Sequence, residues 1–248
     1  MIFAAGLGTR LRPLTDTMPK ALVPVGGRPL IDLLLDKLHR SGFERIVVNV
    51  HHFADMLEQH IRDVAPLYEG MTIVVSDERD NLLDTGGGLR HAAGLFYPQY
   101  PVLIHNVDIL SNADLQTLYD DNAAMLRSGE RDAVLVVSKR HSSRTLIFEM
   151  DNRLVGWRNM QTGEVRGPAT SIEHTVYMMP FSGIHIVHPR LFWQMSSFPV
   201  KFSIIDFYLQ ACTSGKIYGQ IVSDLHLLDV GKQDTLEAAA TFASTHNC

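Results

Sequence analysis

The sequence predicts an α/β fold in which a mainly parallel sheet is flanked by helices and carries an antiparallel insertion. Short β-branched apolar runs alternate with segments of helical periodicity over the first half of the chain, which is typical of βαβ units. From about residue 139 the pattern changes to short paired runs that indicate hairpins. We expect a single domain over residues 1–248, because no internal repeat, low-complexity tract or linker divides the chain.

Local patterns predict each element of the first half. Apolar runs predict strands at residues 2–5, 45–50, 71–76, 102–105 and 132–138. Leucines recur at helical spacing after Pro29, and Gly42 stands where a left-handed cap residue is expected, which predicts a helix between them. Further helices are predicted at residues 54–64 and 112–127.

The second half is expected to be partly antiparallel. Runs at residues 145–150 and 153–157 predict a hairpin that turns at Asp151-Asn152. Strands are predicted at residues 183–187 and 216–222, and helices at residues 203–213 and 233–243.

Composition and charge exclude several classes of protein. Hydrophobic residues make up 46% of the chain and charged residues 20%, as in a soluble globular protein. The 22 Lys and Arg against 27 Asp and Glu leave a net charge of −5, so we expect no nucleic-acid partner. We expect no membrane segment, because no apolar stretch approaches roughly 20 residues. Cys212 and Cys248 form neither a disulfide framework nor a zinc pattern, and we expect a cytoplasmic protein.

A glycine-rich turn at residues 6–10, with the sequence GLGTR, follows the first predicted strand. Such a turn lets backbone N–H groups approach phosphate oxygens without a Cβ in the way, and Arg10 and Arg12 add positive charge. The turn is neither a dinucleotide fingerprint, whose third glycine would fall on Leu11, nor a Walker A loop. The glycine spacing alone is compatible with two interpretations, a phosphate-binding loop and a plain tight turn.

Lys20 follows in a loop that Pro19 and Pro24 stiffen, although taken alone it would be an ordinary surface lysine. The combination is more specific. Gly-x-Gly-Thr-Arg-x-x-Pro, then Pro-Lys, then Pro-x-x-Gly-x-Pro over residues 3–29 closely resembles the signature of the sugar-1-phosphate nucleotidylyltransferases.

The resemblance implies a Rossmann-like sheet of the nucleotide-diphospho-sugar transferase fold. Residues 1 to about 138 would then form the nucleotide-binding half, and about 139 to 248 the half that binds the sugar and supplies a second metal ligand. It also implies the Mg²⁺-dependent transfer of a nucleoside monophosphate from an NTP, with UTP or GTP favoured, to a sugar 1-phosphate. The products would be an NDP-sugar and pyrophosphate.

The same resemblance assigns roles to residues of the first motif. Arg10 would grip the phosphates that leave as pyrophosphate, and Lys20 would neutralise charge at the reacting phosphates. Four residues of the turn would contact the nucleotide: Gly6, Leu7, Gly8 and Thr9. A second glycine-rich segment, residues 84–89, resembles the part of the family that reads the base, through Gly86 and Gly87. The alternative is turn chemistry that opens a helix at Leu89.

Two aspartates are the candidate Mg²⁺ ligands. Asp108 follows the fourth predicted strand, at the sheet edge where ligands bind in open α/β folds. Residues 106–108 and 229–231 resemble the two aspartate motifs of the family, which implies a catalytic role for Asp108 and makes Asp229 the second ligand. Two carboxylates and phosphate oxygens suffice for magnesium.

The candidate sugar contacts are Asn106, Ser182, Gly183 and Asp206. Residues 181–184 resemble the sugar-pocket strand of the family, and Asp206 lies in a segment similar to one near the sugar in some branches. A plain helix-turn acid is the alternative for Asp206.

Three positions depart from the family pattern. Val107 stands where glycine is usual, Lys232 where threonine is frequent, and Asn159 where a Glu-Lys pair usually begins. Two rival functions stay open beside nucleotidylyl transfer to a sugar 1-phosphate. One is cytidylyl transfer to a non-sugar phosphate such as phosphocholine, and the other is a catalytically silent subunit that senses nucleotide sugars.

Overall fold

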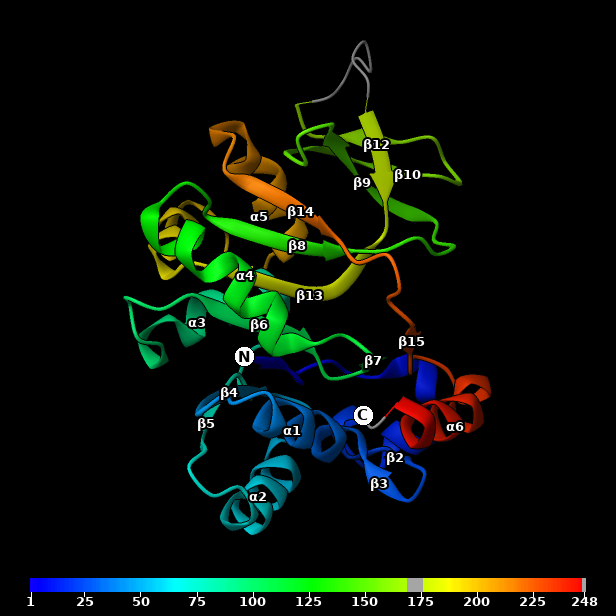
Figure 1. The fold of residues 1–248 in the computed structure, drawn as a ribbon. Coiled ribbons are helices and arrows are strands. Elements are labelled where there is room, and N and C mark those ends of the chain that lie inside the picture. The colour runs from blue at the N-terminus through cyan, green and yellow to red at the C-terminus, as the bar shows by residue number, and fades with distance from the viewer. Residues whose placement is uncertain (169–175, 247–248) are drawn as a thin grey trace. The chain divides into compact units, whose positions relative to one another are not determined.

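The computed structural model describes residues 1–168 and 176–246, and its residues group into two compact units (Figure 1). Unit 1 takes its described residues from Met1–Asp84, His105–Leu118 and His226–Cys248. Unit 2 takes its described residues from Thr85–Ile104 and Tyr119–Leu225. Each unit is assembled from segments that are far apart in the sequence, and the boundary at about residue 138 stays a prediction.

Unit 1 combines parallel strands with two short antiparallel pairs. Its strands are β1 (Ile2–Phe3), β2 (Pro24–Val25), β3 (Arg28–Pro29), β4 (Arg45–Val50), β5 (Thr72–Asp77), β7 (Ile109–Ser111) and β15 (Leu227–Asp229), with the end of β6 (Val102–Asn106). Its helices are α1 (Leu30–Arg40), α2 (Ala54–Val64) and α6 (Leu236–His246). β1 pairs in parallel with both β4 and β6, and β4 pairs in parallel with β5. β1 therefore lies between β4 and β6, and all three strands run in the same direction.

The helix predicted from leucine spacing is α1, and its apolar face forms part of the core. Leu30, Ile31 and Leu35 are 0% exposed. Gly42 follows the helix with φ of +74°, the left-handed conformation that glycine adopts without a Cβ clash, so the predicted cap is confirmed.

Unit 2 contains a mixed sheet and a separate antiparallel sheet. Its strands are β8 (Ala133–Val137), β9 (Arg144–Glu149), β10 (Leu154–Asn159), β11 (Val165–Arg166), β12 (Val176–Met179), β13 (Phe181–Val187) and β14 (Ile217–Ile221). β8 pairs in parallel with β14 and antiparallel with β13. The antiparallel sheet has the order β11-β10-β9-β12, which confirms the predicted insertion. Asn152 takes φ of +71° at the hairpin turn between β9 and β10.

Three further α-helices and eight 3₁₀ helices are present among the described residues. α5 (Ile204–Ala211) belongs to unit 2, while α3 (Asp84–His91) and α4 (Leu115–Ser128) begin in unit 1 and continue in unit 2. Short 3₁₀ helices lie at Thr9–Leu11, Leu14–Asp16, Lys20–Leu22, Ala65–Leu67, Ala92–Leu95, Pro189–Ser197, Cys212–Ser214 and Gln233–Thr235. Among the described residues, no helix is both long enough and apolar enough to cross a lipid bilayer.

The alternative interpretation of residues 84–89, a turn that opens a helix at Leu89, is wrong about where the helix begins. α3 begins at Asp84, so the three glycines lie inside the helix, where their low helix propensity would not place them. Tertiary packing explains the difference, because a Cβ on Gly86 would lie 2.3 Å from the ring of Phe202. The glycine allows α3 to approach that ring.

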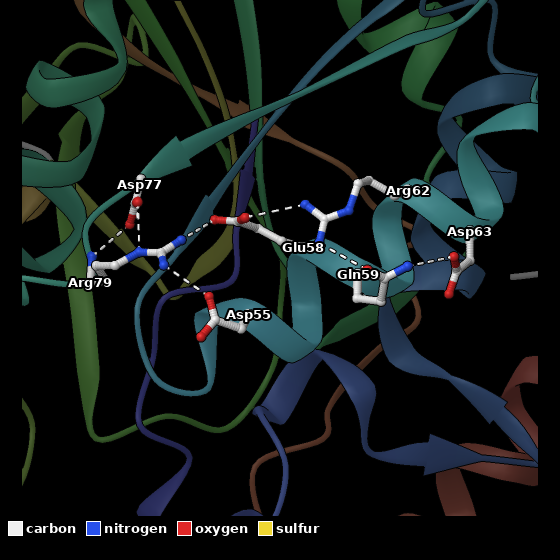
Figure 2. A network of polar contacts seen from close by, with 7 residues as sticks. All are labelled: Asp55, Glu58, Gln59, Arg62, Asp63, Asp77 and Arg79. Atoms are coloured by element: carbon white, nitrogen blue, oxygen red, sulfur yellow. Dashed lines mark hydrogen bonds and ion pairs between the residues drawn. The ribbon is translucent and has the colours of Figure 1, made fainter.

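A network of charged side chains joins α2 to the end of β5 (Figure 2). The guanidinium of Arg79 contacts carboxylates of Asp77, Asp55 and Glu58, from both elements. Exposed ion pairs are individually weak, but one guanidinium shared by three carboxylates restrains the chain where it leaves β5.

Candidate active site

A buried asparagine holds the chain just before the first glycine-rich turn. Oδ1 of Asn49, on β4, accepts hydrogen bonds from Ala4 N at 2.7 Å and Ala5 N at 3.3 Å. Its Nδ2 donates to Glu78 Oε1 at 2.7 Å, and both side chains lie in residues only 3% exposed. Sequence reasoning missed this residue. The signal for it was a single polar residue within an apolar strand.

The turn itself depends on Gly8. Its φ is +62°, and a Cβ there would lie 2.8 Å from Thr15 Cγ2. Thr15 is 2% exposed, and its hydroxyl donates to Gly8 O at 2.9 Å. By contrast, no protein atom lies within 4 Å of the position that a Cβ on Gly6 would take. Gly6, Leu7 and Thr9 are all exposed, so the turn presents backbone to solvent.

Lys20 is a buried, paired lysine, and the surface-lysine alternative is wrong. Its side chain is 10% exposed, and its Nζ forms an ion pair with Oδ2 of Asp108, whose side chain is 20% exposed. Pro19 precedes it in extended conformation and accepts a hydrogen bond from Leu22 N at 2.9 Å. The 3₁₀ turn that Lys20 begins therefore fixes its direction.

The pairing of β7 with β15 brings the two aspartates together. Asp229 pairs in register with Ile109, the residue that follows Asp108. Val230 N also donates to Asp108 O at 2.8 Å. Arg10 Nη2 lies 3.9 Å from Asp229 Oδ2, and both side chains are about half exposed. Four charged residues predicted from separate motifs therefore meet in unit 1.

Gly231 allows this approach. A Cβ on Gly231 would lie 2.6 Å from both Arg10 Nη2 and Asp229 Oδ1. The glycine after the second aspartate is thus explained by close packing against a charged pair.

Asp108 and Asp229 are the acids of this site that could hold a divalent cation. Within the part of the chain that the structure describes, no group of three or more His, Cys, Asp or Glu could hold a metal. A cation here would therefore take further oxygen ligands from substrate and water. Magnesium binds in this way, usually through one or two carboxylates together with substrate phosphates, so the donor set fits Mg²⁺.

The end of β6 and the residue after it carry no charge at neutral pH. His105 is 1% exposed, and burial lowers its pKa to about 4. Its Nδ1 lies 2.8 Å from Asn106 O. Val107, at the position where the family has glycine, is 3% exposed and donates from its N to Phe3 O at 3.1 Å. The valine side chain is therefore part of the core, and Asn106 is half-buried at the strand end.

In unit 2, the second glycine-rich segment bonds to protein backbone. Gly86 N and Gly87 N both donate to Phe202 O, at 2.9 and 3.2 Å. Arg90 holds the segment before Phe202, because its guanidinium donates to four carbonyl oxygens of residues 195–200. The base-reading role of these two glycines stays a prediction.

Two of the candidate sugar residues lie on β13. Ser182 is 1% exposed, and its hydroxyl donates to Val136 O at 2.8 Å and accepts from Ile184 N at 3.3 Å. Gly183 has φ of +80°, where the pairing of β13 with β8 shifts register. Their sugar-binding roles are not tested by these contacts.

Asp206 forms an ion pair that the sequence did not indicate. Arg166 Nη1 lies 2.7 Å from Asp206 Oδ1, and the guanidinium carbon of Arg166 lies 4.0 Å from the centre of the Trp157 ring. Asn159 closes a turn, since its Oδ1 accepts from Gln161 N at 2.9 Å. A sugar contact by Asp206 would have to compete with Arg166.

An exposed glycine turn after the first strand, a buried lysine and two aspartates brought together by paired strands are features typical of enzymes that bind phosphates. The model of the nucleotidyl transferase family matches residues 1–145. The chain is also 34% identical to the N-acetylmuramate alpha-1-phosphate uridylyltransferase of Caulobacter vibrioides, over 98% of this chain and 96% of that protein. The chain therefore belongs to the nucleotidyl transferase family, in agreement with the resemblance to sugar-1-phosphate nucleotidylyltransferases that its motifs carry.

Other proteins share its full extent. The D-glycero-alpha-D-manno-heptose 1-phosphate guanylyltransferase of Aneurinibacillus thermoaerophilus is 23% identical over 96% of this chain and 95% of that protein. The solved structure of the inositol-1-phosphate CTP transferase from T. maritima superimposes with a TM-score of 0.72 at 17% identity, over 98% of this chain and 94% of that one. That likeness confirms the predicted fold.

Proposed function

We propose that the enzyme transfers a nucleoside monophosphate from an NTP to a sugar 1-phosphate, with Mg²⁺, and releases pyrophosphate. The observation that carries the proposal is the meeting of Lys20 with Asp108 and of Arg10 with Asp229 in unit 1, which also holds the exposed glycine turn. Carboxylates, fixed cations and accessible N–H groups are the three kinds of group that a triphosphate and its metal require.

The reaction makes an electrostatic demand and needs no general base. The attacking oxygen belongs to the sugar 1-phosphate and is already ionised at neutral pH. Two anions must approach each other at the α phosphorus, and negative charge increases on the leaving pyrophosphate. Preorganised cations and N–H donors lower both barriers, because they are held in place before the substrates bind.

The burial and pairing of Lys20 suit a cation that stabilises the reacting phosphates. Its side chain is 10% exposed, and a cation held in a water-poor site acts more strongly than one in bulk water. The ion pair with Asp108 keeps the ammonium directed toward the candidate metal ligand. The lysine would therefore stabilise charge close to the α phosphorus.

The exposure of Arg10 suits a residue that binds the β and γ phosphates of the NTP. Its side chain is 58% exposed, and its 3.9 Å contact with Asp229 lies at the limit of an ion pair. The guanidinium can therefore turn toward an incoming anion, and its planar fork matches two phosphate oxygens.

Asp108 and Asp229 would hold the Mg²⁺ ion. When bound, the ion would polarise phosphate oxygens and offset their charge. The paired strands β7 and β15 fix the backbone of both aspartates, so the two ligands are oriented by the fold.

The full-length similarity to an N-acetylmuramate alpha-1-phosphate uridylyltransferase makes UTP and N-acetylmuramate 1-phosphate the first pair to test. A cationic acceptor such as phosphocholine is less favoured. Aromatic faces bind such cations, but Arg166 already covers one face of Trp157 at 4.0 Å.

Pyrophosphate release should be measured for UTP, GTP, CTP and ATP against a panel of sugar 1-phosphates and phosphocholine. We expect one NTP with one sugar 1-phosphate to give pyrophosphate and an NDP-sugar, loss of activity with EDTA, and recovery with Mg²⁺. Release with phosphocholine alone would favour the cytidylyl alternative. NTP binding without pyrophosphate release in any combination would favour a silent sensing subunit.

A further inference from the structure

A hollow beside Arg10 is lined by two further cations, Arg12 and Lys232, for which the proposed mechanism gives no role. It has a volume of about 540 Å³ and lies within unit 1. Five residues line it: Arg10, Arg12, Lys232, Gln233 and Asp234. Three of the lining side chains are cations and one is a carboxylate. Asp229 and Asp16 pair with Arg10 and Arg12, so Lys232 is the cation that gives the hollow its preference for an anion.

The hollow is formed by two segments that are far apart in the sequence and are joined by a hydrogen bond. Gln233 Nε2 donates to Arg12 O at 3.0 Å, which joins the turn after the second aspartate to the end of the first motif. Thr235 Oγ1 donates to Lys232 O at 2.6 Å, so the backbone of Lys232 is fixed while its side chain stays exposed. Arg12 Nε lies 3.1 Å from Asp16 Oδ1, which restrains the second guanidinium.

The position of the hollow relates it to the two aspartates. Lys232 follows Asp229 by three residues, and Gly231 between them allows Arg10 to approach. Arg10 both contacts Asp229 and lines the hollow. Lys232 is one of the positions at which the chain departs from the family pattern.

We propose that Lys232 binds the pyrophosphate tail of the nucleotide, together with Arg10 and Arg12. The inference rests on the proposed function. The β and γ phosphates, which carry most of the negative charge of an NTP, are the part of the substrate that matches a hollow lined by three cations. Lys232 thereby contributes to holding the triphosphate and to retaining the released pyrophosphate.

The test is the binding of inorganic pyrophosphate to the full chain, measured by calorimetry at constant Mg²⁺ and ionic strength. For Lys232→Gln we expect a dissociation constant about three- to tenfold higher, because one charged contact in an exposed hollow is lost. Lys232→Arg should restore most of the affinity. Lys216→Gln, an exposed lysine in unit 2, is the matched control and should bind as the unaltered protein does.

A kinetic readout separates binding from structure. Lys232→Gln should raise KM for the NTP and the inhibition constant of pyrophosphate by a similar factor, and leave KM for the sugar 1-phosphate and the melting temperature unchanged. Unchanged pyrophosphate affinity in Lys232→Gln would overturn the inference. If the unaltered protein released no pyrophosphate from any substrate pair, the proposed function would fail, while the calorimetry would still decide the role of Lys232.

Discussion

The candidate residues of unit 1 and unit 2 differ in what their polar atoms already contact. In unit 1, Lys20, Asp108 and Asp229 pair with one another or with Arg10, and charged groups gather from segments far apart in the sequence. In unit 2, the candidate donors bond to backbone carbonyls of the same unit, as Ser182 does with Val136 O. The polar groups of the candidate residues are therefore paired with charged side chains in unit 1 and with backbone in unit 2.

The difference has a physical basis. A charged pair that is about half exposed, such as Arg10 with Asp229, can exchange its protein partner for a phosphate at little free-energy cost, because both states are charge-balanced. A buried hydroxyl or amide that already has its partner loses that hydrogen bond when it turns to a ligand. We therefore expect Arg10 to exchange its protein partner for a substrate phosphate more readily than Gly86, Gly87 and Ser182 give up their hydrogen bonds.

The largest effect should come from Lys20→Ala. The variant removes a preorganised cation from the reacting phosphates, so we expect kcat for pyrophosphate release to fall about a hundredfold to a thousandfold, or about 3 to 4 kcal/mol. Steady-state assays at saturating substrates measure it, with circular dichroism to confirm the fold. Lys216→Ala, which removes an exposed lysine of unit 2, should retain full turnover. A Lys20→Ala protein that turned over normally would remove Lys20 from the mechanism.

Much of unit 1 could be predicted from the sequence, because its signals are local. The leucine spacing of α1, the apolar strands and the charged residues within short motifs each depend on neighbouring positions. Asn49 could not be assigned a role, since its partners Ala4 and Ala5 are 45 and 44 residues away. Long-range hydrogen bonds of this kind leave only a polar residue in an apolar run as their trace.

The candidate residues of unit 2 were harder to interpret for the same reason. Nothing near Gly86 indicates that Phe202 will pack on it, and helix propensity argues against three glycines inside α3. Nothing near Asp206 indicates its pairing with Arg166. The family motif gives these residues a place in the chain, and the tertiary contacts decide which of their atoms are already bonded.

Gly86→Ala tests whether the second glycine segment serves packing. The new Cβ would lie 2.3 Å from the Phe202 ring and 3.0 Å from Phe202 O, so the helix or the ring must move. We expect the free energy of unfolding to fall by about 1 to 3 kcal/mol, the usual range for overpacking. Chemical denaturation measures it. Gly94→Ala is the control, because nothing lies within 4 Å of its Cβ position. Normal stability with a raised KM for the NTP would instead support base reading.

His105 should make unit 1 sensitive to acid. Its pKa in the folded chain is about 4, below the ordinary 6.5, because burial disfavours the charged imidazole. Between these values the unfolded chain binds a proton that the folded chain does not, so stability falls as pH drops from 6.5 toward 4. The full difference corresponds to roughly 3 kcal/mol.

His105→Gln keeps an amide donor for Asn106 O and removes this titration. Denaturation at a series of pH values should show a smaller loss of stability in the variant below pH 6.5, and a constant difference between the two proteins above it. Carboxylates titrate in both proteins and cancel in the comparison. Parallel curves for the two proteins down to pH 4 would contradict the assignment of the shift to His105.

Ser182→Ala should have the smallest effect, and it separates the two readings of unit 2 most directly. The hydroxyl is buried and donates to Val136 O at 2.8 Å, so its loss should lower stability by about 1 kcal/mol and the melting temperature by about 2 to 4 °C. KM for the sugar 1-phosphate should not change, because a hydroxyl engaged with a carbonyl has no free proton for a sugar oxygen. An increase in that KM of about tenfold with unchanged melting would mean that Ser182 turns from Val136 to the substrate, and that unit 2, like unit 1, exchanges a protein contact for a ligand.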